Sequence, residues 1–155
     1  MMQAITKFMG QDHDRLDDLF REFQTLKGSD FAKAKHAFSE FKRGLQRHIV
    51  WEEEILFPLF EHQTDIQDRG PTAVMRMEHR RIKASLEQIH DRLIKGETNA
   101  IEFEQQLVET LTAHNKKEEA ILYPWIDQSL SDQEADTTLA RMREVPEERY
   151  QHCCH

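Results

Sequence analysis

The sequence contains one pattern twice, at a spacing of sixty-six residues. The positions that recur are His13 as His79, His48 as His114, Glu52 as Glu118 and Pro58 as Pro124. The segment His48-Ile-Val-Trp-Glu52-Glu-Glu-Ile-Leu-Phe-Pro58 aligns directly with His114-Asn-Lys-Lys-Glu118-Glu-Ala-Ile-Leu-Tyr-Pro124. A duplication that keeps imidazoles and carboxylates where a helical bundle would place leucine indicates a two-metal centre, with one half supplied by each repeat.

The composition favours helices over strands. A chain of 155 residues has the length of one domain, since domains commonly contain roughly 100–200 residues. Hydrophobic residues make up 38% and charged residues 32%, which suits amphipathic helices with strongly solvated faces. Five glycines and four prolines provide few tight turns, so we do not expect an all-β fold.

The charge and the hydropathy of the chain restrict its partners and location. A formal net charge of −8 argues against nucleic acid or an anionic membrane as the main partner, because both select basic surfaces. No stretch approaches the ~20 apolar residues that a membrane span requires. The first residues lack the apolar core of a signal peptide. We therefore expect a cytoplasmic protein.

Hydrophobic residues recur at helical spacing in four long segments. The first segment ends at Gly28, the second is capped by Asp30, the third ends near Gly96, and the fourth follows Asn99, which together with Glu102 resembles a capping box. The inward-facing stripes of the four segments are Met9, His13, Leu16, Phe20 and Phe23; Phe31, Ala34, Phe38, Phe41, Leu45, His48, Glu52, Ile55 and Leu59; Met75, His79, Ile82, Leu86, Ile89 and Leu93; and Phe103, Leu107, Leu111, His114, Glu118, Ile121 and Trp125.

Four amphipathic helices joined by short loops predict an all-α fold, an antiparallel up-down-up-down four-helix bundle. We expect the bundle to occupy residues 1–130. Residues 131–155 are expected to form an additional short C-terminal helix and a tail, because Ser131 and Glu134 make another capping-box pattern. Pro58 and Pro124 each remove a backbone donor and either kink or end their helices.

Six ionisable residues fall on the inward stripes, and they are the candidate metal ligands: His13, His48, Glu52, His79, His114 and Glu118. Burying such groups without partners costs several kcal/mol, and metal ions are a common solution. A His and a Glu four residues apart lie on one helix face, so each H-x-x-x-E pair can address the same site. Four imidazoles and two carboxylates suffice for two metals, if each metal takes two histidines and the carboxylates bridge.

Other polar residues fit ordinary roles. A single histidine on an apolar face is more often a satisfied core residue than a ligand, but four in register with two glutamates argue against that interpretation. His36 and His90 fall off the inward stripes. His62 lies about 21 Å along a straight helix from His48, which is too far for the same site. Glu53, Glu54 and Glu119 point around the helix and are interpreted as surface charge. Met9 and Met75, four residues before His13 and His79, are interpreted as core residues or an apolar lid.

The two cysteines are adjacent in the C-terminal segment Gln151-His152-Cys153-Cys154-His155. Adjacent cysteines rarely bridge each other without strain, so no structural disulfide is expected. The alternatives are a reduced terminus without a role and a secondary site for a soft metal ion.

The arrangement of His13, His48-x-x-x-Glu52, His79 and His114-x-x-x-Glu118 resembles that of the hemerythrin-like (HHE cation-binding) proteins, over about residues 8–128. The resemblance implies two Fe ions with an oxo or hydroxo bridge. It also implies that His13 and His48 bind one iron, that His79 and His114 bind the other, and that Glu52 and Glu118 bridge them. Imidazole and carboxylate ligands, with no thiolate in the core, agree with iron.

The sequence departs from the oxygen-carrying hemerythrins at two ligand positions. Those proteins have a further histidine where this chain has Met75, and an aspartate five residues after the last histidine, whereas Glu118 follows His114 by four. The ligand set is closer to that of di-iron proteins implicated in nitric-oxide stress and iron–sulfur cluster repair. Those proteins usually carry an additional N-terminal domain with a cysteine, whereas this chain begins almost directly at its first expected helix. A stand-alone hemerythrin-like domain is therefore expected here.

Three hypotheses for function follow. The first is a di-iron protein that binds O₂ or nitric oxide for sensing, storage or stress response. The second is an iron donor or repair factor for iron–sulfur clusters, or a peroxidase-like di-iron enzyme. A metal- and ligand-binding protein is favoured over an enzyme. The third is a bundle in which zinc or nothing fills the site and an acidic surface binds a protein partner. Glycine-rich phosphate loops and nucleophile elbows are absent from the sequence, and the ferritin-type Glu-x-x-His pattern does not match the His-x-x-x-Glu pairs.

Overall fold

The computed structural model describes residues 3–66 and 70–151, and within these ranges every regular element is helical. The all-α class predicted from the sequence is therefore confirmed. The elements are α1 (Ala4–Leu26), α2 (Phe31–Trp51), the π-helical turn η1 (Glu52–Leu56), α3 (Phe57–Thr64), α4 (Pro71–Ile94), α5 (Ile101–Lys117), the π-helical turn η2 (Glu118–Leu122), α6 (Tyr123–Gln128), α7 (Asp132–Arg143) and the 3₁₀ turn η3 (Glu147–Arg149).

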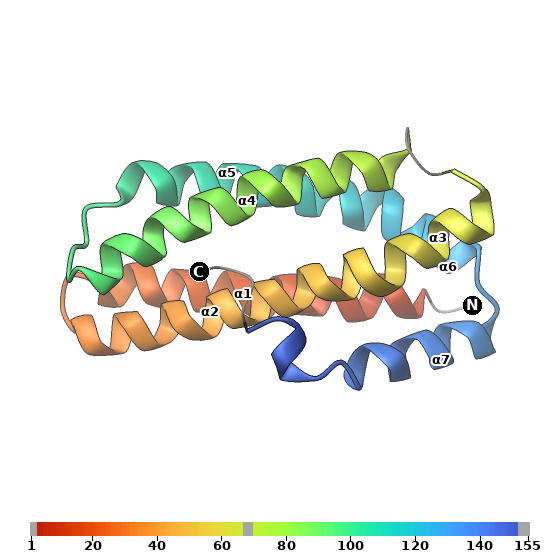
Figure 1. Cartoon of the computed structure of the whole chain (residues 1–155), viewed down its shortest axis with the longest axis horizontal. Coiled ribbons are helices and arrows are strands. Elements are labelled where there is room, and N and C mark those ends of the chain that lie inside the picture. Colours follow the sequence, from red (N-terminus) through yellow and green to blue (C-terminus); the bar gives the residue numbers. More distant parts are fainter. Residues whose placement is uncertain (1–2, 67–69, 152–155) are drawn as a thin grey trace.

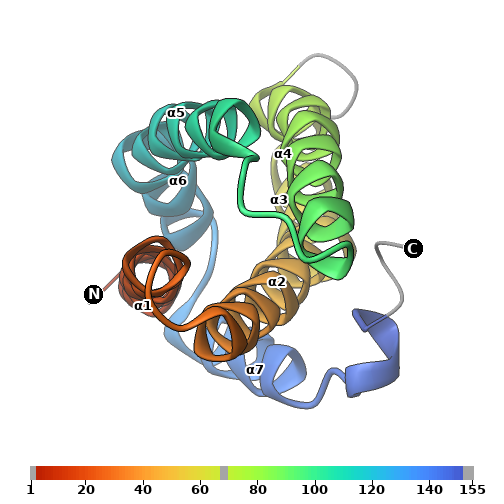
Figure 2. The ribbon, with the colours of Figure 1, turned by 90° about the vertical axis from the view of Figure 1, so that its left-hand side faces the viewer.

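Four long helical segments lie side by side and share one interior (Figure 1). α1 packs mainly on α2, and α4 packs mainly on α5. The end-on view in Figure 2 shows the four segments around a common axis, with α7 outside them on the side of α1 and α2. None of the helices in the described ranges is long and apolar enough to cross a membrane.

The helix ends largely follow the local sequence. The Asp30 side chain accepts a hydrogen bond from the backbone N–H of Lys33 and caps α2 as expected. Ser131 and Glu134 form the predicted capping box at the start of α7. The capping box predicted at Asn99 is wrong: α5 is preceded by Ala100, and no side chain caps it.

Both prolines lie just inside a helix that continues past them. Pro58 is the second residue of α3, and Pro124 is the second residue of α6. Before each proline the backbone makes one π-helical turn, in which the N–H of Phe57 bonds to the carbonyl of Glu52 and the N–H of Tyr123 to that of Glu118. A π turn inserts one extra residue into the helix and is frequent at functional sites.

The inserted residue rotates the face that points inward. The predicted stripe holds as far as Ile55 in the first repeat and Glu118 in the second, but Ile121 is 59% exposed and Leu122 is 1% exposed. The predictions of Leu59, Ile121 and Trp125 as inward residues are therefore wrong: Leu59 is half-buried, Trp125 is 37% exposed, and the buried residues are Phe60, Leu122 and Ile126.

The apolar core consists of two clusters with a polar layer between them. The larger cluster contains Leu16, Phe41, Leu86 and Leu107, on one side of the layer along the helices. The other contains Met9, Phe60, Met75, Ile126 and, from α7, Leu139 and Met142. The residues between the two clusters on each long segment are the histidines and glutamates of the duplicated pattern.

Candidate metal centre

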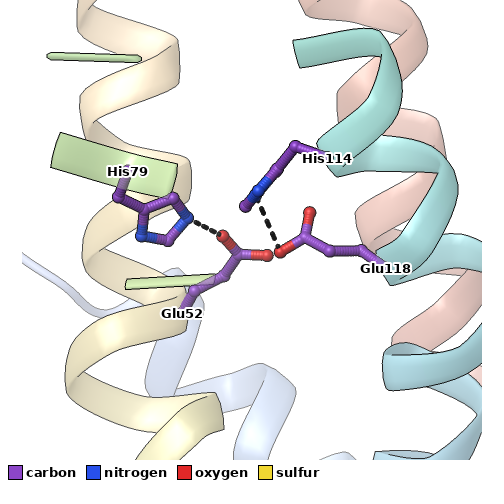
Figure 3. Close-up of side chains that lie close together, drawn as sticks. All are labelled: Glu52, His79, His114 and Glu118. Atoms are coloured by element: carbon purple, nitrogen blue, oxygen red, sulfur yellow. Dashed lines mark hydrogen bonds and ion pairs between the residues drawn. The ribbon is translucent and has the colours of Figure 1, made fainter. Parts of the chain in front are cut away.

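The six residues predicted from the duplication lie together in the polar layer, and all are buried. Their side chains come from α1 (His13), α2 (His48), η1 (Glu52), α4 (His79), α5 (His114) and η2 (Glu118). The two glutamates are 0% exposed, and the four imidazoles are 1–3% exposed. Figure 3 shows Glu52 and Glu118 pointing toward one another across the bundle, with His79 and His114 beside them.

The histidines form two pairs across neighbouring helices. The ring centroids of His13 and His48 are 4.7 Å apart, on α1 and α2. The ring centroids of His79 and His114 are 4.9 Å apart, on α4 and α5. Each pair therefore consists of the two histidines of one repeat.

The carboxylate of Glu52 faces both pairs. Its Oε1 atom lies 2.9 Å from Nε2 of His79, on the adjacent segment α4. Its Oε2 atom lies 3.6 Å from Nε2 of His48, one turn earlier in the same segment. The two oxygens of one carboxylate thus serve two different histidine pairs.

Glu118 repeats this arrangement from the other half of the sequence. Its Oε1 atom lies 3.2 Å from Nε2 of His13, and its Oε2 atom lies 3.2 Å from Nε2 of His114. Oε2 of Glu118 is buried and accepts no hydrogen bond from any residue in the described ranges, although His114 is close. A buried carboxylate oxygen without a hydrogen bond is costly unless another partner compensates it.

A second set of carboxylates holds the outer nitrogen of every imidazole. Nδ1 of His13 lies 2.6 Å from Oε2 of Glu119, and Nδ1 of His79 lies 2.6 Å from Oε2 of Glu53. The contacts are equivalent, because Glu53 and Glu119 are sixty-six residues apart.

Asp12 and Glu78 do the same for the other two histidines. Nδ1 of His48 lies 2.8 Å from Oδ2 of Asp12, and Nδ1 of His114 lies 2.8 Å from Oε1 of Glu78. A carboxylate at Nδ1 accepts a hydrogen bond from the N–H there, so Nε2 of each neutral ring presents its lone pair to the centre. Such carboxylate–histidine pairs orient metal-binding imidazoles and raise their basicity.

The interpretation of Glu53 and Glu119 as surface charge is therefore wrong, although both side chains are partly exposed. Glu54 does fit that interpretation, since it pairs with Arg149 at the surface. Asp12 and Glu78 were not singled out from the sequence. The repeat could have identified them, because Asp12 and Glu78 are carboxylates at the same sixty-six-residue spacing.

Tyr123 is a further member of the layer that the stripes did not predict. Its ring is fully buried, and its hydroxyl donates to Oε2 of Glu52 at 2.5 Å. Oε1 of Glu118 lies 2.8 Å from the same hydroxyl oxygen. The one-residue shift at η2 carries Tyr123 inward, as the matching shift at η1 does for Phe57.

The charges in the layer change the pKa values of its members. Burial alone would lower the pKa of His48, but Glu52 and Asp12 outweigh it and raise the pKa to about 10. For His79, burial is likewise outweighed by hydrogen bonds to Glu52 and Glu53, which raise the pKa to about 9.

The acidic and phenolic groups shift in the directions that complement the histidines. Burial would raise the pKa of Glu52, but the charge of His48 and hydrogen bonds hold it well below its usual value. Burial and the charges of Glu118 and Glu52 raise the pKa of Tyr123 well above its usual value. The layer is therefore a network in which the imidazoles compensate the carboxylates.

The donor atoms are close enough to hold metal ions. One nitrogen or oxygen from each of Glu52, His79, His114 and Glu118 lies within 4.8 Å of all the others, and the same holds for His13, His48 and Glu118. The other histidines in the described ranges lie outside the layer, with His36 and His62 exposed and His90 half-buried. The predictions for Cys153 and Cys154 concern residues outside the described ranges.

Comparison with known proteins agrees with this geometry. Residues 4–126 match the family described as the hemerythrin HHE cation binding domain. An uncharacterized hemerythrin-like protein of Schizosaccharomyces pombe is 27% identical over 135 residues, which cover 86% of this chain and 64% of the relative. The chain thus spans just under two thirds of the length of that relative. No solved structure matches this chain with significance. Because the family match covers most of the sequence, including all six predicted residues, the chain belongs to the hemerythrin HHE cation-binding family.

Proposed function

We propose that the protein is a non-haem di-iron protein that binds O₂ or nitric oxide for sensing, storage or stress response. One observation carries the proposal: Glu52 and Glu118 each direct one carboxylate oxygen at the His13–His48 pair and the other at the His79–His114 pair. This is the relation that two bridging carboxylates have to the ligands of two adjacent ions. The proposed ligands are thus His13, His48, Glu52, His79, His114 and Glu118.

The chemistry of the donor set fits iron. Four imidazole nitrogens and four carboxylate oxygens are intermediate to hard donors, and residues 3–66 and 70–151 place no thiolate in the polar layer that would select a softer metal. The buried Oε2 of Glu118, which accepts no hydrogen bond in the described ranges, gains a partner if a cation lies beside it. When bound, a pair of irons supplies the Lewis acidity and one-electron chemistry that O₂ and nitric oxide require.

The residues of the chain have three tasks in this proposal. Asp12, Glu53, Glu78 and Glu119 accept hydrogen bonds from the Nδ1–H groups and would so direct each Nε2 toward the irons. The two apolar clusters keep bulk water out of the layer. Because the imidazoles are almost fully buried, a ligand must pass between packed side chains, which favours a diatomic molecule over a larger substrate.

Metal analysis and optical spectroscopy test the proposal directly. Protein purified without added metal is expected to contain iron at about two equivalents per chain when loading is complete. Anaerobic reduction followed by O₂ or nitric oxide is expected to change the visible spectrum. Zinc instead of iron, or a spectrum that responds to neither gas, would contradict the proposal. Turnover of peroxide, or transfer of iron to an apo-cluster acceptor, would instead assign the protein as an enzyme or an iron donor.

Three broader features belong to the same proposal. We assign an antiparallel up-down-up-down order to the four long segments, which the chain path in Figure 1 supports. Residues 1–130 would form the metal-binding bundle and residues 131–155 an appended helix and tail. A cytoplasmic location agrees with the acidic composition and would be checked by cell fractionation.

A further inference from the structure

The two halves of the centre differ at one position of the repeat. Tyr123 and Phe57 are equivalent residues, sixty-six positions apart, and both are fully buried. The Tyr123 ring lies 5.7 Å from the ring of His13, and the Phe57 ring stacks on His79 at 5.8 Å and 12°. Each aromatic ring therefore lies against the first histidine of the other repeat, but only one of them carries a hydroxyl.

The hydroxyl oxygen of Tyr123 is surrounded by donor atoms of the candidate centre. The four distances from Oη are 3.2 Å to Nε2 of His13, 3.1 Å to Nε2 of His48, 2.5 Å to Oε2 of Glu52 and 2.8 Å to Oε1 of Glu118. All four atoms are those that face the ion assigned to the His13–His48 pair. No donor atom of His79 or His114 is among them.

These distances match those within one coordination sphere. Ligands that lie about 2.1 Å from an octahedral ion are roughly 3 Å apart when they are at right angles. Every ligand in an octahedron has four such neighbours, and Oη of Tyr123 has four neighbours at 2.5–3.2 Å. The oxygen thus has the position of a fifth ligand relative to two imidazoles and two carboxylate oxygens.

Among the described residues, the other half of the centre offers no equivalent donor. The Phe57 ring covers His79 with carbon atoms only, and Met75 is buried nearby in the same apolar cluster. An ion at His79 and His114 would therefore have two imidazoles, one oxygen from each glutamate, and an apolar wall.

From this asymmetry we infer that Tyr123 is a seventh protein ligand, bound through Oη to the iron of His13 and His48, and that O₂ or nitric oxide binds at the iron of His79 and His114. The inference rests on the proposed di-iron function. Coordination replaces the O–H bond of the phenol with an O–iron bond, and the proton is released to solvent without any change in oxidation state. Glu52 and Glu118 would then bridge the iron bound by Tyr123 and the iron at which O₂ or nitric oxide binds.

Spectroscopy of the iron-loaded protein tests the assignment of Tyr123. A phenolate bound to Fe(III) gives a charge-transfer band in the visible region and resonance-enhanced ring vibrations. The wild-type protein is expected to show both, and Tyr123→Phe is expected to lose both while it retains both irons. Tyr150→Phe removes the only other tyrosine of the chain and is expected to change neither signal.

Exchange of the two aromatic residues provides the matched variant. Phe at this position is compatible with the fold, because Phe57 occupies it in the first repeat. The double variant Phe57→Tyr and Tyr123→Phe is expected to recover the phenolate signals from the opposite iron. Circular dichroism and urea unfolding would verify that each variant is folded before its spectrum is compared.

Nitric-oxide titration of the reduced protein tests which iron is open. The wild type is expected to bind one equivalent per chain, and Tyr123→Phe is expected to bind about one more, because the second iron loses its phenolate. Two bound irons with identical spectra and identical nitric-oxide stoichiometry in wild type and Tyr123→Phe would overturn the inference and leave the di-iron proposal intact. Absence of iron from the wild type would overturn both.

Discussion

Nδ1 of His79 lies 2.6 Å from Oε2 of Glu53, a side chain that reaches from the flank of one helical segment to an imidazole on another. The imidazole is almost fully buried, whereas the glutamate is partly exposed. This contact fixes the Nδ1 proton and directs Nε2 toward Glu52, which lies 2.9 Å away. Glu53 is therefore a positioning residue for the proposed centre.

The first prediction concerns this outer contact. Glu53→Gln and Glu119→Gln each keep the side-chain volume but replace the accepting carboxylate with an amide. We expect each to weaken iron binding by roughly 10- to 100-fold, the usual cost of losing such a partner of a metal-binding histidine. Competition with a chelator of known affinity measures the change. Glu54→Gln is the control, because Glu54 pairs with Arg149 at the surface, and an equal loss in all three variants would contradict the prediction.

The second prediction concerns the bridging glutamates. Glu52→Ala and Glu118→Ala each remove an oxygen from both histidine pairs, so both irons are expected to be lost together. His13→Ala and His79→Ala each remove a nitrogen from one pair, so mainly one iron is expected to be lost. Iron per chain, measured by elemental analysis after gel filtration, distinguishes the two results. Loss of a single iron in all four variants would show that the carboxylates do not bridge.

The third prediction concerns the pH dependence of stability in protein stripped of metal by a chelator. The pKa values of His48 and His79 are raised in the folded protein to about 10 and about 9, from 6.5 for an unperturbed histidine. A raised folded pKa means that protonation stabilises the fold. The contribution is fully present below pH 6.5 and is lost as the pH rises through about 9 and 10. Urea unfolding between pH 6.5 and 10 should show this decrease.

A variant of Glu52 provides the control for this pH dependence. Glu52 raises the pKa of both histidines, by its charge and by hydrogen bonds. Glu52→Gln removes that charge, so stability should depend less on pH over the same interval. Metal binding should have the opposite trend, since protons compete with iron for Nε2 and the affinity rises with pH. A metal-free protein whose stability increases from pH 6.5 to 10 would contradict the assignment.

The sequence alone was sufficient to predict the six central residues. On each of the four segments a single helical period connects the apolar stripe to a histidine, and the two glutamates continue the same period by one turn. No backbone irregularity lies between the stripe and these residues, so the spacing in sequence translates directly into position. The duplication then identified them as one set.

The parts that could not be predicted depend on two different causes. The π turns at Glu52 and Glu118 add a residue that a constant helical period does not include, so that period predicts Ile121 in the core and gives no reason to expect Tyr123 there. The outer carboxylates depend on the reach of a side chain between neighbouring helices. A hydrophobic stripe describes one helix at a time, so it does not show which side chains reach a neighbouring helix. The sixty-six-residue repeat does contain the carboxylate pairs Asp12 and Glu78, and Glu53 and Glu119.

The last prediction tests the shift in helical phase at η2. Leu122 is 1% exposed and belongs to the apolar cluster, whereas Ile121 is 59% exposed. Leu122→Ala should lower the free energy of unfolding by about 2–5 kcal/mol, the range for a buried leucine. Ile121→Ala should change it by no more than about 0.5 kcal/mol, as for an ordinary surface position.

The first repeat provides the matched comparison for this prediction. Ile55, the equivalent of Ile121, is 6% exposed, and α7 packs on η1 and therefore covers the first π turn. Ile55→Ala should for that reason destabilise the protein clearly more than Ile121→Ala, although the two isoleucines occupy the same position of the repeat. Urea unfolding of the three variants, all in the metal-free state, measures the differences. A large loss for Ile121→Ala with little change for Leu122→Ala would mean that the helix keeps a constant period through η2, and Tyr123 would then not face the centre.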